Sequence, residues 1–108
     1  MATYVSYYDC SGWESSIEVL NAQGEERAFA LTAYGQDGGK LLSKTYALPA
    51  HATIRIKLNE QVELAGHQGK VAIESTGNAS DQFPAIMTVC ADGVDYKQGN
   101  RFFPFTRL

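Results

Sequence analysis

The sequence has 108 residues, of which 44% are hydrophobic and 19% are charged, and its formal net charge is −3. This composition is that of a globular chain, and the length suits one core rather than two, so we expect a single domain spanning residues 1–108. The nine Lys and Arg residues are scattered, which disfavours nucleic acid as a partner, and no apolar run is long enough for membrane insertion. The N-terminus lacks the basic start and apolar stretch of a secretory signal, so we expect a cytoplasmic protein.

The first half of the chain alternates apolar and polar side chains in short runs that end at turn residues, as antiparallel strands do. This alternation predicts strands at residues 3–8, 16–21, 29–34 and 40–48. The segment 35–39, Gly-Gln-Asp-Gly-Gly, predicts a hairpin between the last two, because Asp-Gly and Gly-Gly accept the positive φ of tight turns. Pro49 should end the fourth strand or confine it to a sheet edge, since proline donates no backbone hydrogen bond.

The second half continues the pattern. Residues 53–58 alternate most cleanly, with Ile54, Ile56 and Leu58 expected to face inward. Residues 59–68 are harder to interpret: residues 60–64 fit a helical turn or a loop, and we predict a loop. The remaining expected elements are strands at 69–75, 85–91 (covered on both faces), 94–97 and 101–107, with a hairpin at Asp92-Gly93 and an edge position at Pro104.

About eight short strands, several of them apolar on more than one side, do not fit a single open sheet with one solvated face. Two packed sheets bury those apolar sides. The expected fold is therefore an all-β, antiparallel β-sandwich, either jelly-roll-like or Ig-like.

Catalytic residues are hard to find in this sequence. A nucleophilic triad needs an imidazole, and the histidines, His51 and His67, stand in turns without a nucleophile motif. A small hydrolase using His51 with Asp37 or Glu60 is the least favoured hypothesis. We expect no enzyme activity, no catalytic residues and no cofactor.

The two cysteines, Cys10 and Cys90, are 80 positions apart. Together with the histidines they lack the close spacing of zinc ligands, so we expect no metal site. In a reducing compartment both are most simply free, buried thiols. A disulfide between them is the alternative, and it would require an oxidising compartment.

Aromatic residues gather near both ends of the chain: Tyr4, Tyr7, Tyr8 and Trp13 near the first, and Tyr96, Phe102, Phe103 and Phe105 near the second. Such residues fill a core or a subunit interface, and this is the favoured interpretation. Exposed, they would instead form a platform that stacks on sugar rings, as in a carbohydrate-binding module. The residues that we expect at a ligand site are Tyr8, Trp13, Tyr96 and Arg101.

Three segments, 16–21, 33–38 and 48–53, carry a resemblance to a known family. In order, they contain a strand, a tyrosine followed by an acidic-glycine hairpin, the tripeptide Leu-Pro-Ala, and an amphipathic strand. This order resembles the sensory rhodopsin transducer family over residues 13–91. The resemblance implies a soluble sandwich that forms a homo-oligomer, typically a tetramer, and that binds rather than catalyses. It assigns no ligand residue, and a rhodopsin partner is not carried over.

The leading hypothesis is a non-enzymatic β-sandwich that self-associates and binds a partner protein or a small ligand, in a signalling role. The alternative is a carbohydrate-binding module.

Overall fold

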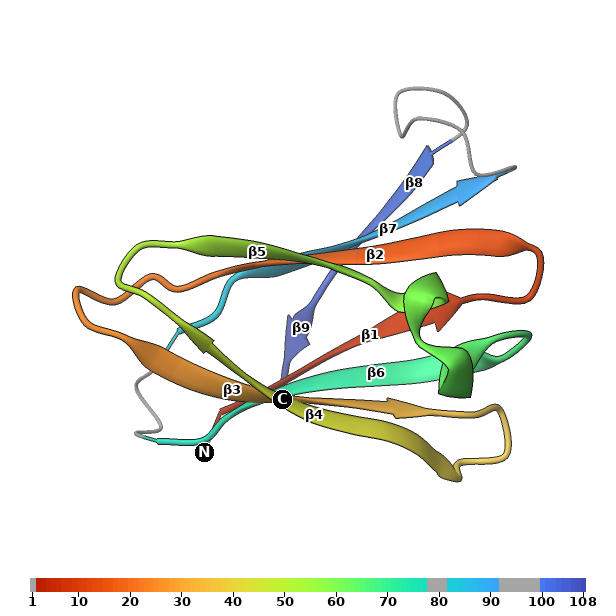
Figure 1. The fold of residues 1–108 in the computed structure, drawn as a ribbon, viewed down its shortest axis with the longest axis horizontal. Helices are drawn as coiled ribbons and strands as arrows, with labels where there is room; N and C mark the ends of the chain where they lie inside the picture. Colours follow the sequence, from red (N-terminus) through yellow and green to blue (C-terminus); the bar gives the residue numbers. More distant parts are fainter. Residues whose placement is uncertain (1, 78–81, 92–99) are drawn as a thin grey trace.

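The protein is an antiparallel β-sandwich, seen in a computed structural model that describes residues 2–77, 82–91 and 100–108 (Figure 1). One sheet has five strands in the order β4 (Lys40–Leu48), β3 (Arg27–Tyr34), β6 (Gln68–Ser75), β1 (Thr3–Asp9) and β9 (Thr106–Arg107). The other has four, in the order β5 (Thr53–Lys57), β2 (Trp13–Leu20), β7 (Ala85–Ala91) and β8 (Asn100–Pro104). Every neighbouring pair is antiparallel, which confirms the expected fold class.

The register of β2 and β5 shows how period-two alternation builds the sheets. Ile17 lies opposite Ile56, and both are buried between the sheets. Glu18, the next residue along β2, lies opposite Arg55 on the other side of the same pair. Successive side chains point to opposite faces of a strand, so the apolar residues reach the core while the charged ones reach solvent.

Both prolines that were expected to limit strands do so. Strand β4 stops at Leu48, immediately before Pro49, and it is an edge strand. Strand β8 ends at Pro104 and is the edge of the four-stranded sheet. After Phe105 the chain continues as β9 at the edge of the five-stranded sheet, so these last residues pass from one sheet to the other.

The connection between β5 and β6 is the main difference from the sequence interpretation. Instead of an irregular loop, it forms two single 3₁₀ turns, η1 (Leu58–Glu60) and η2 (Val62–Leu64). Leu58 and Leu64 are both fully buried in the core, whereas Val62 is 83% exposed. A 3₁₀ turn spans three residues, too few to give a recognisable period, and for this reason the sequence did not separate a helical turn from a loop here. The expected Asp92-Gly93 hairpin and the strand at 94–97 lie outside the described residues.

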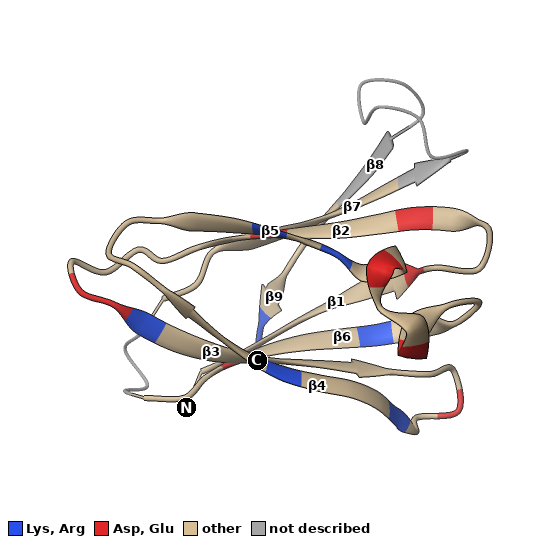
Figure 2. Ribbon diagram, viewed as in Figure 1, with Lys and Arg blue, Asp and Glu red and all other residues tan. Residues whose placement is uncertain are grey.

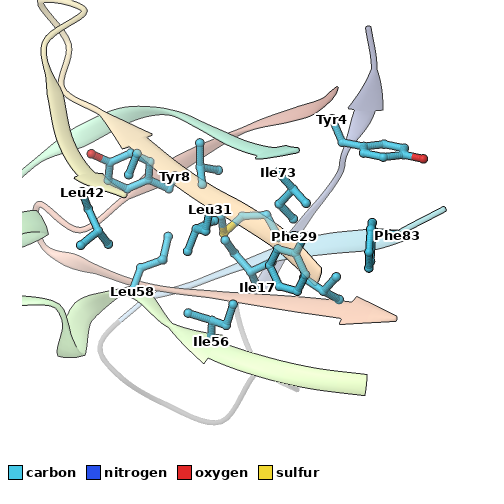
Figure 3. Close-up of a cluster of buried hydrophobic side chains, with 14 of the residues drawn as sticks. Tyr4, Tyr8, Ile17, Phe29, Leu31, Leu42, Ile56, Leu58, Ile73 and Phe83 are labelled. Carbon is cyan, nitrogen blue, oxygen red and sulfur yellow. The ribbon is translucent and has the colours of Figure 1, made fainter. Parts of the chain in front are cut away.

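The core between the sheets is rich in aromatic rings (Figure 3). Phe29 is fully buried, stacks on Tyr46 at 5.3 Å between ring centroids, and meets Phe83 at the same distance in a tilted arrangement. Tyr4 and Tyr8 from β1 are also buried. Of the N-terminal aromatic cluster, Tyr4 and Tyr8 therefore lie in the core, whereas Tyr7 is 46% exposed.

Candidate functional site

The residues expected at a ligand site do not form one surface in the described part of the chain. Tyr8 is fully buried, and its hydroxyl donates a hydrogen bond of 2.9 Å to the carbonyl oxygen of Tyr34. Burial, with smaller contributions from Cys10 and Tyr7, raises the pKa of Tyr8 to about 12. Its enclosed ring therefore offers no face to a ligand. Trp13 begins β2 in the other sheet and is half-buried against the core.

The other two residues expected at a ligand site are Tyr96 and Arg101. Tyr96 lies outside the described residues. Arg101 lies in β8, where the structure describes the backbone and its pairing with Val89 but not the side chain.

A different tyrosine pair lines a hollow on the outer face of the five-stranded sheet, the face turned away from the four-stranded sheet. Tyr7 of β1 lies opposite Lys70 of β6, and the Lys70 ammonium sits 4.5 Å from the centroid of the Tyr34 ring of β3. Tyr7 is 46% exposed, and its hydroxyl donates a 3.0 Å hydrogen bond to the side-chain oxygen of Gln68. The hollow measures about 570 Å³, and we name it the tyrosine groove; it is lined by Ser6, Tyr7, Tyr34, Gly35, Gln36, Gly38, Gly69 and Lys70.

Three of the residues that line the tyrosine groove are glycines: Gly35, Gly38 and Gly69. Gly69 has φ +153°, and a Cβ there would fall on the carbonyl oxygen of Tyr34 and within 3.1 Å of the Gly35 carbonyl oxygen. Only a residue without a side chain lets β6 approach the end of β3 so closely. The hairpin beyond Tyr34 is the one that its sequence predicted: Gly35 N–H donates to the Gly39 carbonyl at 2.9 Å, and Gly38 has φ +88°.

The tyrosine groove continues into a more polar hollow of about 300 Å³ that shares Gly35 and Gln36 with it. Its other lining residues come from the β1–β2 connection, the β3–β4 connection, the start of β4, the η2–β6 connection and the start of β6: Ser11, Asp37, Leu41, Gly66, His67 and Gln68. An aromatic surface thus adjoins a surface of hydroxyl, amide, carboxylate and imidazole groups.

The partners suggested for a hydrolase lie apart. His51 follows β4 and Asp37 precedes it, so the nine residues of β4 separate them. At about 3.3 Å per residue this strand puts roughly 30 Å between its ends. Glu60 in η1 is likewise separated from His51 by the length of β5, and Figure 1 shows the β4–β5 connection at the opposite end of the sandwich from the η1 and η2 turns. Within the described residues, no group of three His, Cys, Asp or Glu side chains is placed to hold a metal ion.

Cys10 is a free, buried thiol, as its favoured interpretation expected. Its sulfur lies 3.4 Å from the side-chain oxygen of Asn59. Burial, with a smaller contribution from the charge of Asp9, raises the pKa of the Cys10 thiol from 9.0 to about 11. The side chain of Cys90 lies outside the described residues.

The raised pKa predicts a protected thiol. A shift from 9.0 to about 11 lowers the thiolate fraction at pH 8 about 100-fold, and the thiolate is the nucleophile. We expect iodoacetamide to alkylate Cys10 at least about 100-fold more slowly in the folded protein than in urea, with peptide mass mapping as the measurement. Equal rates in the two states would contradict this placement of Cys10.

No protein-family profile, curated protein or solved structure matches this chain significantly. The class of protein is therefore defined by the fold itself, a small two-sheet antiparallel sandwich. None of the helical turns in the described residues has the length and apolar character needed to cross a membrane.

Proposed function

We propose that this protein is a non-enzymatic binding domain, with the tyrosine groove as its ligand site and a sugar as the class of ligand. The observation that carries the proposal is the row of Tyr7, Lys70 and Tyr34 in a hollow whose lining also includes Gly35, Gly38 and Gly69. This proposal uses Tyr7, the neighbour of the expected ligand residue Tyr8 along β1, in place of the sugar platform that the sequence suggested around Trp13 and Tyr96.

The chemistry of the groove suits a sugar ring. A sugar has C–H groups on one face and hydroxyl groups around its edge, so it needs an apolar surface beside hydrogen-bonding groups. Tyr7 supplies an aromatic face whose orientation is fixed by the bond to Gln68. Lys70, Gln36 and the adjoining polar hollow supply donors and acceptors for hydroxyl groups.

Ligand binding in the groove can be tested by NMR because the backbone amides of its lining glycines give signals that a bound ligand would shift. Backbone amides of Gly35, Gly38 and Gly69 are expected to shift when a panel of monosaccharides and disaccharides is titrated to about 10 mM. Replacing Tyr7 with alanine should weaken binding roughly threefold to tenfold, since an aromatic contact contributes about 0.5–1.5 kcal/mol. The matched control is Val62→Ala, which truncates another exposed apolar side chain and should leave affinity unchanged. Unmoved glycine amides across the whole panel would exclude a sugar ligand.

Self-association is the second part of the proposed function, and it is favoured by a separate observation. The outer face of the five-stranded sheet beyond the groove carries small, uncharged side chains such as Ala30, Thr32 and Ala72, of which Thr32 and Ala72 are already buried by their neighbours within one copy. Monomeric antiparallel sheets usually cover a solvated face with charged residues. A homo-oligomer built through this face would bury it, and any signalling role would then depend on the assembled form.

A further inference from the structure

The outer faces of the two sheets differ in chemistry. On the four-stranded sheet, the outward positions of β2 and β5 include Glu14, Glu18, Arg55 and Lys57. The three central strands of the five-stranded sheet are β3, β6 and β1. Between Thr3 and Tyr7 of β1, and at the positions of β6 and β3 paired with this segment, the charged outward residues are Lys70 and Glu74. Figure 2 shows acidic residues gathered at the η1 and η2 turns and at the β2–β3 and β3–β4 connections, away from these strands.

Strand register arranges this outer face in three rows that run across the strands. The first row is Tyr7, Lys70, Tyr34 and Lys40. The second is Val5, Ala72, Thr32 and Ser43. The third is Thr3, Glu74, Ala30 and Thr45. The first row is therefore large and positive, the middle row is small and neutral, and the third row is small and negative.

We propose that two copies of this chain pack these faces together about a two-fold axis that runs along the middle row. Such an axis keeps each strand over its counterpart and reverses its direction, so the first row of one copy covers the third row of the other. Lys70 then faces Glu74 of the second copy, and Tyr34 faces its Ala30. Because the contact is isologous, each of these complementary pairs occurs twice.

Charge and size both select this axis over the other two-fold arrangement. An axis parallel to the strands would set each row against the same row of the other copy, so the two positive first rows would face each other and the small rows would do the same. Like charges placed opposite each other destabilise a contact, and facing small residues would leave a gap. The proposed axis pairs opposite charges and sets each large ring against a small residue.

The size of the face indicates a weak, reversible dimer. Four strands about 4.8 Å apart and about seven residues long cover roughly 450 Å² per copy, a total of about 900 Å² that is below the range of stable complexes and within that of weak ones. A dissociation constant in the micromolar range is therefore expected. Tyr7, Lys70 and Tyr34 also line the tyrosine groove, so a ligand in the groove and a second copy exclude each other, and a saturating ligand should release the dimer.

The decisive experiment exchanges the two charges. Sedimentation equilibrium from about 1 to 500 μM, without any ligand, should show the 11.8 kDa chain shifting toward twice that mass. Lys70→Glu and Glu74→Lys should each weaken the dimer at least about 30-fold, because each replaces two attractive contacts by two repulsive ones. The double variant should restore dimerisation. Mixing the two single variants should give a heterodimer, since each then supplies the charge that the other lacks.

The controls separate this proposal from a folding defect and from the sugar site. Lys57→Glu makes the same charge change on the other sheet and should leave the dimer intact. Circular dichroism should show all variants folded, and recovery in the double variant gives a second check. A wild-type chain that stays monomeric at 500 μM would overturn the dimer without touching the NMR test of the groove. A dimer that is insensitive to the single exchanges, or single variants that fail to pair when mixed, would overturn this face and axis.

Discussion

Replacing Gly69 with alanine is expected to lower the free energy of unfolding by about 3 kcal/mol or more, a severe effect for one methyl group. The new Cβ would fall on the carbonyl oxygen of Tyr34, and its next neighbours are the Gly35 carbonyl carbon and oxygen. All three belong to backbone, so none can rotate away. The same Tyr34 carbonyl accepts the hydrogen bond from the buried Tyr8 hydroxyl, and displacing it would disturb the core as well as the groove.

Gly24→Ala is the matched control for this substitution. A Cβ on Gly24 meets only an imidazole nitrogen of His51, at 4.0 Å, and Gly24 does not have a positive φ. That change should be neutral or slightly stabilising, because alanine has fewer unfolded conformations than glycine. Urea unfolding followed by Trp13 fluorescence measures both variants. If the two lose similar stability, the close approach of β6 to Tyr34 is wrong.

Replacing Asn21 with alanine is expected to cost about 2–4 kcal/mol. Asn21 is fully buried, and its amide nitrogen donates hydrogen bonds to the carbonyl oxygens of Glu25, Leu48 and Pro49 at 2.9–3.0 Å. Its side-chain oxygen accepts a hydrogen bond from the Gln23 backbone N–H at 2.9 Å. Alanine would leave these buried groups without partners, and an unsatisfied buried group costs about 1–3 kcal/mol. Because Asn21 follows β2 and Leu48 ends β4, the loss would also loosen one end of the sandwich.

Two further variants decide whether those hydrogen bonds are responsible. Asn21→Asp keeps the shape but turns a donor into an acceptor that faces three carbonyl oxygens, and it should be at least as destabilising as alanine. Gln82→Ala removes an exposed amide and should change stability by no more than about 0.5 kcal/mol. Equilibrium urea unfolding at neutral pH measures the free energy of unfolding of the Asn21→Ala, Asn21→Asp and Gln82→Ala variants. An Asn21→Asp variant as stable as the parent chain would contradict the described network.

The sequence singled out one segment of the proposed groove, the aromatic cluster of β1, but the residue expected to bind a ligand there was the buried neighbour of the one that lines the groove. The aromatic cluster 4–8 was recognised, and Tyr8 was selected where Tyr7 lines the groove. Adjacent residues of a strand face opposite sides, and a sequence alone does not say which side is the core. The feature that separates them is register: Tyr8 pairs with Gly69, while Tyr7 pairs with the exposed Lys70.

By itself, the sequence determined the class of fold and the ends of most strands, because side-chain alternation, glycine turns and proline stops are local properties. The pairing of Lys70 with Tyr7, the approach of Gly69 to Tyr34 and the burial of Asn21 were decided only by the tertiary structure. The cited contacts join residues 27 to 63 positions apart, and which distant strands become neighbours depends on packing the whole core rather than on any local pattern.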